Sequence, residues 1–180
     1  MQLILVRHPQ PLVASGVCYG RTDLAVAPAQ LEQTLAALRV SLPPGLPLYA
    51  SPLRRCAELA DRLSSAPIYD ARLVEMDFGT WEMQPWDAIP RAGIDAWAED
   101  VVHYQPGGGE SVLQMAVRIA AFHADLQRQL GERSAIVVCH AGAMRLLSAC
   151  HSGLAPVEMA LHAAQAAHNI PYGSTLILPH

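Results

Sequence analysis

The sequence predicts a single α/β domain in which a mostly parallel central sheet is covered by helices on both faces. Strand and helix patterns alternate along the chain, and 180 residues are enough for one domain with a substantial core. Two apolar runs, residues 3–6 (LILV) and 135–139 (AIVVC), lack the polar alternation of a half-exposed strand. Such runs are typical of parallel strands that are buried on both faces. Residues 1–180 are therefore expected to form one domain around these two strands.

The first half of the chain is predicted to contain three strands and two helices. After the strand at 3–6, a loop of turn-forming residues leads to a helix at 29–40, which the segment SLPPGLP ends. Short strands are expected at 48–50 and 68–73. Between them, SPLRRCAELADRL predicts a helix with Ser51 as its N-cap and a proline in its first turn.

The second half continues the alternation after one irregular segment. Residues 82–106 show no periodicity and are interpreted as an excursion beyond the sheet. A long amphipathic helix follows GGGES, and its predicted buried stripe consists of Val112, Met115, Ile119, Phe122, Leu126 and Leu130. The strand at 135–139, a helix that extends through Cys150 and a last strand at 174–178 complete the pattern.

Composition restricts the classes of partner. A net charge of −4 provides no basic surface for nucleic acid or an anionic membrane. No segment reaches a membrane-spanning length, and the first apolar run is too short for a signal peptide. Four cysteines without C-x-x-C spacing favour free thiols in a reducing cytoplasm. We therefore expect a cytoplasmic protein with no nucleic-acid or membrane partner. Every basic side chain is an arginine, so any anion site must use guanidinium groups.

Three predicted strands end in imidazole or guanidinium side chains. Arg7 and His8 follow the first strand, which Pro9 ends because proline has no backbone N–H. His140 follows the strand at 135–139, and SPLRR follows the strand at 48–50. In open α/β sheets, ligands bind at the carboxyl ends of the strands. These side chains are therefore expected to share one site.

The residue types indicate a phosphate site. The guanidinium fork matches phosphate geometry, and a helix N-terminus adds backbone N–H donors. A histidine in such a site can attack phosphorus and form a phosphohistidine that water later clears. The leaving oxygen then needs a proton, for which LVEMDFG offers Glu75 and Asp77. Each histidine taken alone could be a satisfied core residue, but three such strand ends favour a site.

Five short motifs extend this argument to a family. They are RH near the N-terminus, SPLRR, LVEMDFGTWE, PGGGES and CHAG, and they span residue 3 to about residue 147. In this order and spacing they resemble the histidine phosphatase superfamily, which is phosphoglycerate mutase-like. The resemblance covers nearly the whole chain. It implies the corresponding α/β fold, a phosphatase activity on a small-molecule phosphomonoester, and no metal or other cofactor.

The resemblance implies catalytic roles for three residues. His8 corresponds to the phosphorylated nucleophile, and His140 corresponds to the second histidine of the pocket. Glu75, which stands four residues before Gly79, corresponds to the proton donor. Asp77 is then expected to stabilise its loop.

The resemblance also implies the phosphate ligands. Arg7 is the neighbour of the nucleophile, and the backbone N–H of Ala141 is expected to face the phosphate. In SPLRR the family's arginine stands four residues after the serine, which selects Arg55 over Arg54. No metal ligand is implied.

The first loop departs from the usual family pattern. Pro9, Gln10 and Ala14 stand where the family commonly has glycine, glutamate and asparagine, so one usual phosphate contact is missing and the neighbouring loop must compensate. That loop, ASGVCYGRTDLAV, resembles the GxCYGxTDxxL pattern of alpha-ribazole phosphatases, the branch that acts in cobalamin biosynthesis. The resemblance implies alpha-ribazole 5′-phosphate as the substrate.

Substrate contacts are expected from the loop and from the excursion. Tyr19, Gly20 and Arg21 are the expected substrate-binding residues of the loop. The excursion at 82–106 is expected to cover the substrate. Aromatic side chains in and beside it can provide a stacking surface for a base, namely Trp81, Trp86, Trp97 and Tyr104.

Other functions stay open at the level of sequence. A broad-specificity phosphatase or a phosphoglycerate mutase-like enzyme on another small phosphorylated metabolite is the main alternative. A metallohydrolase using His8 and His140 lacks the H-x-H or D-x-H spacing of a metal site. A non-catalytic phospho-ligand binder is a further alternative, kept open by Ala14. No pattern encodes the oligomeric state, and a homodimer is compatible with the sequence.

Overall fold

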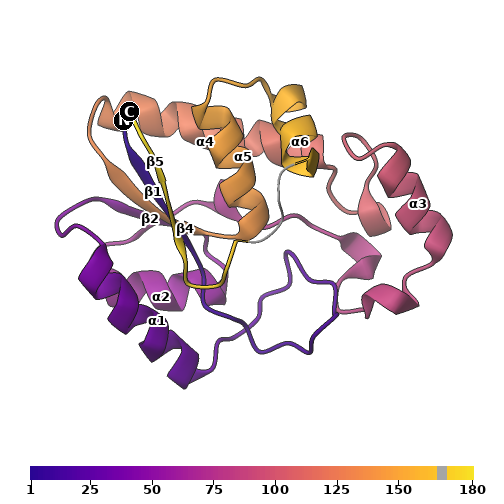
Figure 1. Ribbon diagram of the computed structural model, residues 1–180, viewed down its shortest axis with the longest axis horizontal. Helices are drawn as coiled ribbons and strands as arrows, with labels where there is room; N and C mark the ends of the chain where they lie inside the picture. The colour runs from indigo at the N-terminus through magenta and orange to yellow at the C-terminus, as the bar shows by residue number, and fades with distance from the viewer. Residues whose placement is uncertain (166–169) are drawn as a thin grey trace.

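The computed structural model describes residues 1–165 and 170–180, and these form an α/β domain around one mixed sheet (Figure 1). The strands of the described chain are β1 (Leu3–Arg7), β2 (Leu48–Ala50), β3 (Ile68–Tyr69), β4 (Ala135–Cys139) and β5 (Thr175–Leu178). Their order is β3-β2-β4-β1-β5. All neighbouring pairs are parallel except β1 and β5, which are antiparallel. The predicted fold class is confirmed.

Helices cover both faces of the sheet. α1 (Pro28–Ser41) and α2 (Arg54–Leu63) pack on one face, and α4 (Val112–Leu130), α5 (Ala141–His151) and α6 (Pro156–Gln165) pack on the other (Figure 1). Successive side chains of a strand point to opposite faces, so each face of a central strand needs apolar residues. This requirement explains the uninterrupted apolar runs.

The apolar residues of β1 divide between two core clusters. Leu3 and Leu5 pack in the cluster beneath α4, α5 and α6, whereas Ile4 and Val6 pack in the cluster beneath α1 and α2. The predicted stripe of α4 is buried except at its first residue, which is only partly buried. A capping box starts α4, in which the Ser111 hydroxyl accepts a hydrogen bond from the backbone N–H of Gln114 at 3.2 Å.

The strand register brings the predicted strand ends together. Arg7 of β1 lies opposite Cys139 of β4, and Ala50 of β2 lies opposite Val138. The residue after each of these strands therefore emerges at the same edge of the sheet. The backbone N–H of His8 donates to the carbonyl of Cys139 at 3.1 Å, which continues the ladder past the end of β1.

Two local predictions in the first half of the chain are wrong. Ser51 is not the N-cap of α2, which begins at Arg54 after Leu53, because the buried Ser51 hydroxyl hydrogen-bonds His140 instead. The strand predicted at 68–73 ends at Tyr69. There the Asp70 carboxylate accepts the backbone N–H of Arg72 at 2.8 Å and starts a 3₁₀ turn.

The excursion at 82–106 is more regular than the sequence suggests. It contains α3 (Arg91–Glu99), which lies away from the sheet at the far end of the molecule (Figure 1). A small core of its own, built on Trp81, Ile89 and Cys18, supports this segment. Among the described residues, no helix is both long enough and apolar enough to cross a membrane.

Candidate active site

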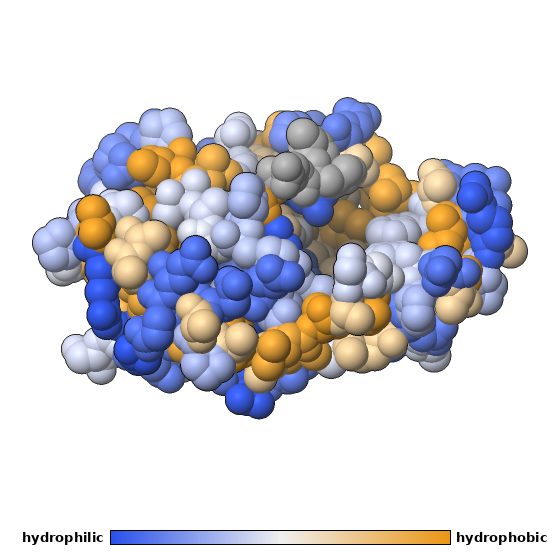
Figure 2. All heavy atoms as spheres, turned by 60° about the horizontal axis from the view of Figure 1, so that its bottom comes forward, coloured by the Kyte–Doolittle hydropathy of each residue, from blue (hydrophilic) through white to orange (hydrophobic). Residues whose placement is uncertain are grey.

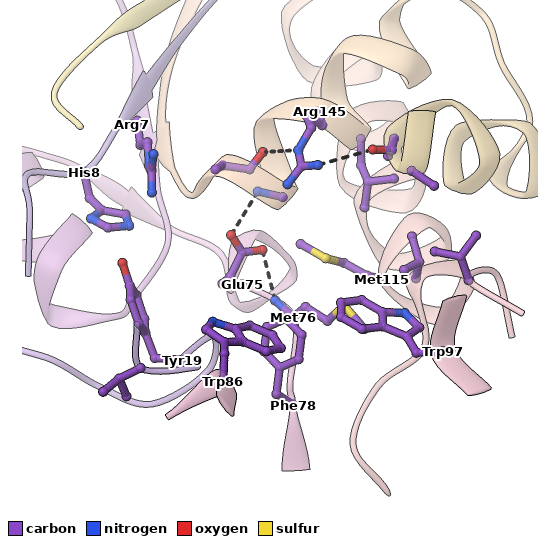
Figure 3. Close-up of a pocket in the computed structure, with 18 of the residues that line it drawn as sticks. Arg7, His8, Tyr19, Glu75, Met76, Phe78, Trp86, Trp97, Met115 and Arg145 are labelled. Carbon is purple, nitrogen blue, oxygen red and sulfur yellow. Dashed lines mark hydrogen bonds between the residues drawn. The ribbon is translucent and has the colours of Figure 1, made fainter. Parts of the chain in front are cut away.

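The charged strand ends meet at one end of a cavity of about 640 Å³ at the carboxyl edge of the sheet (Figure 3). Figure 2 shows a hollow on this side of the molecule with hydrophobic side chains in its depth. Six of the predicted site residues line the cavity, namely Arg7, His8, Tyr19, Arg55, Glu75 and Ala141. His140, Gly20 and Arg21 do not line it.

His8 is a neutral imidazole with an unprotonated Nε2 atom. Its ring is buried, and Nδ1 lies 2.6 Å from the carbonyl oxygen of Pro9, which can only accept a hydrogen bond. Nδ1 therefore carries the proton, and Nε2 keeps its lone pair. Burial, together with the charges of Arg55 and Arg7, lowers the pKa of His8 to about 3. Proline at position 9 lacks a backbone N–H but keeps the carbonyl that orients this ring.

His140 lies beside His8, with ring centroids 5.0 Å apart, and orients Arg55. Its Nδ1 atom accepts a hydrogen bond from Arg55 Nε at 3.2 Å, and its Nε2 atom lies 2.8 Å from the Ser51 hydroxyl. Because a guanidinium group only donates, Nδ1 is unprotonated. Burial lowers the pKa of His140 well below its usual value, and repulsion from His8, whenever that ring is protonated, and from the Arg55 guanidinium acts in the same direction.

Arg55 connects this histidine to the first loop. Its guanidinium is fully buried and donates to the backbone carbonyl of Thr22 at 2.7 Å and to that of Gly20. A buried cation is costly unless hydrogen bonds and an anion compensate for lost hydration. The carbonyls provide the hydrogen bonds, and an anion in the cavity would provide the opposite charge.

Arg7 is the second guanidinium at this end of the cavity. Its Cζ atom lies 3.8 Å from the centroid of the Tyr172 ring, which is a stacked cation–π arrangement. The Tyr172 hydroxyl in turn lies 2.6 Å from that of Tyr19. Arg7 Nη1 donates to the carbonyl of Ile170, whereas its buried Nε has no acceptor among the described residues. A phosphoryl oxygen is the kind of acceptor that this donor lacks.

Glu75 approaches the N-terminus of α5. Its carboxylate accepts the backbone N–H of Gly142 at 2.9 Å and that of Met76 at 3.1 Å (Figure 3). Close packing accompanies these bonds, because a Cβ atom on Gly142 would lie 2.3 Å from Glu75 Oε1. The glycine of CHAG thus leaves space for the carboxylate. The free N–H groups of the first turn of α5 also give this end of the cavity a positive potential.

Glu82 fixes the first loop to the excursion. Its carboxylate accepts backbone N–H groups from Gly20, Arg21 and Thr22 at 3.0, 2.9 and 3.2 Å, and another from Phe78 at 3.1 Å. Burial alone would raise the pKa of Glu82, but a hydrogen bond from the Thr22 hydroxyl and the backbone bonds from Gly20, Phe78 and Arg21 outweigh it and lower the pKa. Since Arg55 binds two carbonyls of the same loop, the loop is held from both sides.

The loop residues predicted to bind substrate divide into two groups. Tyr19 lines the cavity, whereas Gly20 lies outside the cavity lining, with its backbone groups bonded to Arg55 and Glu82. The Arg21 side chain is 66% exposed and lies 3.6 Å from Asp77. Substrate contact by Gly20 and Arg21 stays a prediction. Asp77 accepts the backbone N–H of Gly79 at 2.8 Å and so stabilises its loop, as expected.

Sequence reasoning misses four residues that shape the site. The local pattern assigns Ser51 to a helix cap, shows Glu82 only as part of a motif and gives no role to Tyr172. Arg145 lines the cavity and donates from Nη1 to the carbonyl of Ala163 at 3.2 Å. Its position one turn after Ala141 in the helix that follows CHAG is the signal that could have identified it.

These groups can together carry out phosphoryl transfer. A neutral imidazole offers a lone pair, two arginines and a helix N-terminus provide positive charge, and one carboxyl group can move a proton. Within residues 1–165 and 170–180, no cluster of three or more His, Cys, Asp or Glu side chains is placed to hold a metal ion.

Buried histidines are expected to make the folded protein acid-sensitive. The pKa values of His8 and His123 are lowered by burial to about 3 and about 4, and that of His140 is lowered as well. Below about pH 6.5 the unfolded chain binds protons that the folded chain does not. Each of these histidines should then remove up to about 1.4 kcal/mol per pH unit from the free energy of unfolding as pH falls from 6.5 towards its folded pKa.

Urea unfolding at pH 7, 6 and 5 measures this effect. His123 does not line the cavity and contacts His151, with 3.1 Å between the two ring nitrogens. A His123→Gln variant should show a smaller pH slope than the unchanged protein. An identical slope in both proteins would contradict the assignment for His123.

Comparisons with known proteins agree with this geometry. The family model of the histidine phosphatase superfamily (branch 1) matches residues 3–170. A protein of Hydrogenobacter thermophilus, provisionally named phosphoserine phosphatase 2, is 26% identical over 162 residues, which cover 85% of this chain and 79% of the relative.

Solved structures of a phosphatase and of a phosphoglycerate mutase are also similar to this chain. Mycobacterial glucosyl-3-phosphoglycerate phosphatase in complex with VO3 is 27% identical with a TM-score of 0.82, and the match covers 99% of this chain and 92% of that one. Phosphoglycerate mutase from Thermus thermophilus is 26% identical with a TM-score of 0.75, and the match again covers 99% and 92% of the two chains.

Proposed function

The chain belongs to the histidine phosphatase superfamily (branch 1) and is a phosphatase, and we propose that it is a metal-independent phosphomonoesterase that acts through a phosphohistidine at His8. The observation that carries this proposal is the bond from His8 Nδ1 to the Pro9 carbonyl, because it leaves Nε2 as a nucleophile at the arginine-rich end of the cavity. The buried, neutral state of the ring keeps this lone pair available at neutral pH.

The proposed reaction has two steps. In the first, His8 Nε2 attacks phosphorus, the ester P–O bond breaks, and Glu75 gives a proton to the leaving oxygen. In the second, Glu75 takes a proton from a water molecule that attacks the phosphohistidine, which releases phosphate and restores neutral His8. Arg7 and Arg55 balance the charge of the phosphoryl oxygens, together with the N–H of Ala141. A catalytic role for His140 stays a prediction; its position supports a role in orienting Arg55.

We further infer that the substrate is alpha-ribazole 5′-phosphate, a substrate of cobalamin biosynthesis. The support is the first loop, which resembles that branch of the family and lies at the cavity through Tyr19. The names of the relatives favour a second candidate, namely action on another small phosphorylated metabolite, because they refer to phosphoserine, glucosyl-3-phosphoglycerate and phosphoglycerate.

Phosphate release in excess EDTA tests both levels of the proposal. Alpha-ribazole 5′-phosphate, p-nitrophenyl phosphate and 3-phosphoglycerate would be compared at equal concentrations. Strong preference for the ribazole substrate would support the full proposal. Turnover of the other two alone would support the mechanism and overturn the cobalamin assignment. Activity that appears only when a divalent metal is restored would overturn metal independence.

Gly142 is expected to position Glu75. In a Gly142→Ala variant, the new methyl group would displace the carboxylate, which is the free end of a flexible side chain, so the helix itself need not move. Gly142 is the second residue of α5, where alanine is compatible with the helix, but displacement of the carboxylate breaks its hydrogen bonds to Met76 and Gly142. We expect the variant to fold, with kcat on an alkyl phosphate lower by roughly 10- to 100-fold.

A double-mutant cycle separates this effect from general damage. In a Glu75→Ala background, Gly142→Ala should change kcat little, because the carboxylate that it displaces is gone. Equal losses in both backgrounds would show that Gly142 does not act through Glu75.

A further inference from the structure

The end of the cavity away from His8 is apolar and aromatic. Beyond Glu75 and Arg145, the lining changes from charged groups to hydrophobic side chains (Figure 3). Its members include Phe78, Trp86, Trp97 and Met115. A substrate that fills the cavity therefore needs a phosphate at one end and an apolar group at the other.

The two indole rings form an aromatic surface with nearly parallel ring planes. The planes of Trp86 and Trp97 differ by only 11°, with ring centroids 6.4 Å apart, and Figure 3 shows the rings side by side. Phe78 packs its ring edge-on against both, at 5.8 Å from each and at angles of 86° and 75°. Such edge-to-face packing favours a fixed orientation of the two indoles.

This surface differs from an ordinary aromatic core. Trp81 and Tyr104, which the sequence also suggests as stacking surface, pack in the small core of the excursion and do not line the cavity, whereas Phe78 and Trp97 pack against that core and also line the cavity. Trp86 lines the cavity and is 39% exposed, whereas Trp81 is 6% exposed. An exposed tryptophan beside a charged site is costly to hydrate and gains stability when a ligand covers it.

We propose that Phe78, Trp86 and Trp97 form a leaving-group subsite that binds a flat aromatic group of the substrate alcohol. This inference rests on the proposed function and deepens it, because it assigns a substrate class to the same cavity. The phosphate lies at His8, the ester oxygen lies near Glu75, and the aromatic group covers the indoles. Short carboxylated substrates such as phosphoserine or 3-phosphoglycerate carry no aromatic group to cover this surface.

Two synthetic esters separate the effect of ring binding from the effect of bond breaking. The probes are 2-(2-naphthyl)ethyl phosphate and propyl phosphate. Both release a primary alcohol of similar acidity, so a difference in kcat/KM reports binding of the ring rather than ease of bond breaking. Stacking on an aromatic side chain should favour the naphthyl ester by roughly 10- to 100-fold in the unchanged protein.

Variants then assign the preference to the indoles. Trp86→Ala should raise KM for the naphthyl ester by roughly 10-fold or more and affect propyl phosphate far less, whereas Trp86→Phe should retain most of the preference. Tyr69→Ala is the matched control, because Tyr69 is an exposed aromatic residue of β3 outside the cavity lining. It should change neither substrate.

The outcomes distinguish the subsite from the proposed function. Equal kcat/KM for both esters, or a preference that survives in a Trp86→Ala/Trp97→Ala double variant, would overturn the subsite and leave the phosphatase mechanism intact. If neither ester is hydrolysed, calorimetry can still test the subsite, by comparing the affinity of the naphthyl ester for the unchanged protein and for Trp86→Ala. Weaker binding to Trp86→Ala would support the subsite while the proposed function fails, and equal binding would overturn the subsite.

Discussion

Replacement of His8 by alanine is expected to abolish phosphate release, with kcat lower by roughly 10⁴-fold or more. The Nε2 lone pair of His8 is the group that attacks phosphorus in the proposed first step. Alanine removes this nucleophile, although the arginines can still bind the phosphate. The fold should survive, because the backbone bond from His8 to the Cys139 carbonyl does not involve the imidazole. Circular dichroism and urea unfolding at pH 7 would check the fold beside the activity assay.

His8→Asn is the sharper variant of the same experiment. Its side-chain amide can replace the Nδ1–H group that donates to the Pro9 carbonyl, but it has no counterpart of Nε2. We expect this variant to be as inactive as His8→Ala and better folded. The unchanged protein can be mixed with an ester that carries labelled phosphorus and denatured in alkali during turnover. Because phosphohistidine is stable in alkali and hydrolysed in acid, the protein should retain label that a later acid treatment removes. Turnover by either variant, or label bound to both variants, would show that another residue is the nucleophile.

Much of this arrangement could be predicted from local sequence. Apolar runs without alternation identify β1 and β4, since each must fill both faces of the sheet. Because parallel strands end at one edge of a sheet, these runs are enough to place Arg7, His8 and His140 at the same edge. That β1 and β4 are direct neighbours follows from the sheet order, which strand order along the chain does not predict. The family resemblance then selects Glu75 and Arg55, which local patterns alone leave undecided.

Contacts between distant segments could not be predicted in this way. The carboxylate of Glu82 binds three backbone N–H groups some 60 residues earlier in the chain, and no periodicity encodes such a contact. Ser51 shows a related difficulty. A serine before a proline and a helical pattern fits an N-cap, but its hydroxyl pairs with His140, 89 residues away, at 2.8 Å. The buried histidine needs that partner, so tertiary structure overrides the local preference.

The same reasoning explains the aromatic residues. The sequence groups Trp81, Trp86, Trp97 and Tyr104 as equivalent, because it contains no information on which indole faces a cavity. In the structure, Trp86 and Trp97 line the cavity, whereas Trp81 and Tyr104 do not; Trp97 also packs against the core that contains Trp81. This division could come only from the way in which the excursion folds against Phe78 and the first loop.

Glu75→Gln is expected to separate substrates by the acidity of their alcohols. An alkyl phosphate needs a proton on its leaving oxygen, whereas p-nitrophenolate leaves without one. The rate of the first step should therefore fall by roughly 10²- to 10⁴-fold for propyl phosphate and by far less for p-nitrophenyl phosphate. Single-turnover kinetics measure that step directly. Because a smaller fraction of folded protein would lower both rates by the same factor, the ratio of the two rates is unaffected by any loss of folding.

The aryl substrate carries a second consequence, because the proposed second step needs Glu75 as a base. A Glu75→Gln variant should release nitrophenolate in a burst close to the enzyme concentration and then turn over slowly, with phosphohistidine accumulating. The amide oxygen of glutamine can still accept one of the N–H groups of Met76 and Gly142, so the pocket should keep its shape. Equal losses on alkyl and aryl esters without a burst would show that Glu75 moves no proton. A proton carrier would then have to be sought elsewhere in the cavity.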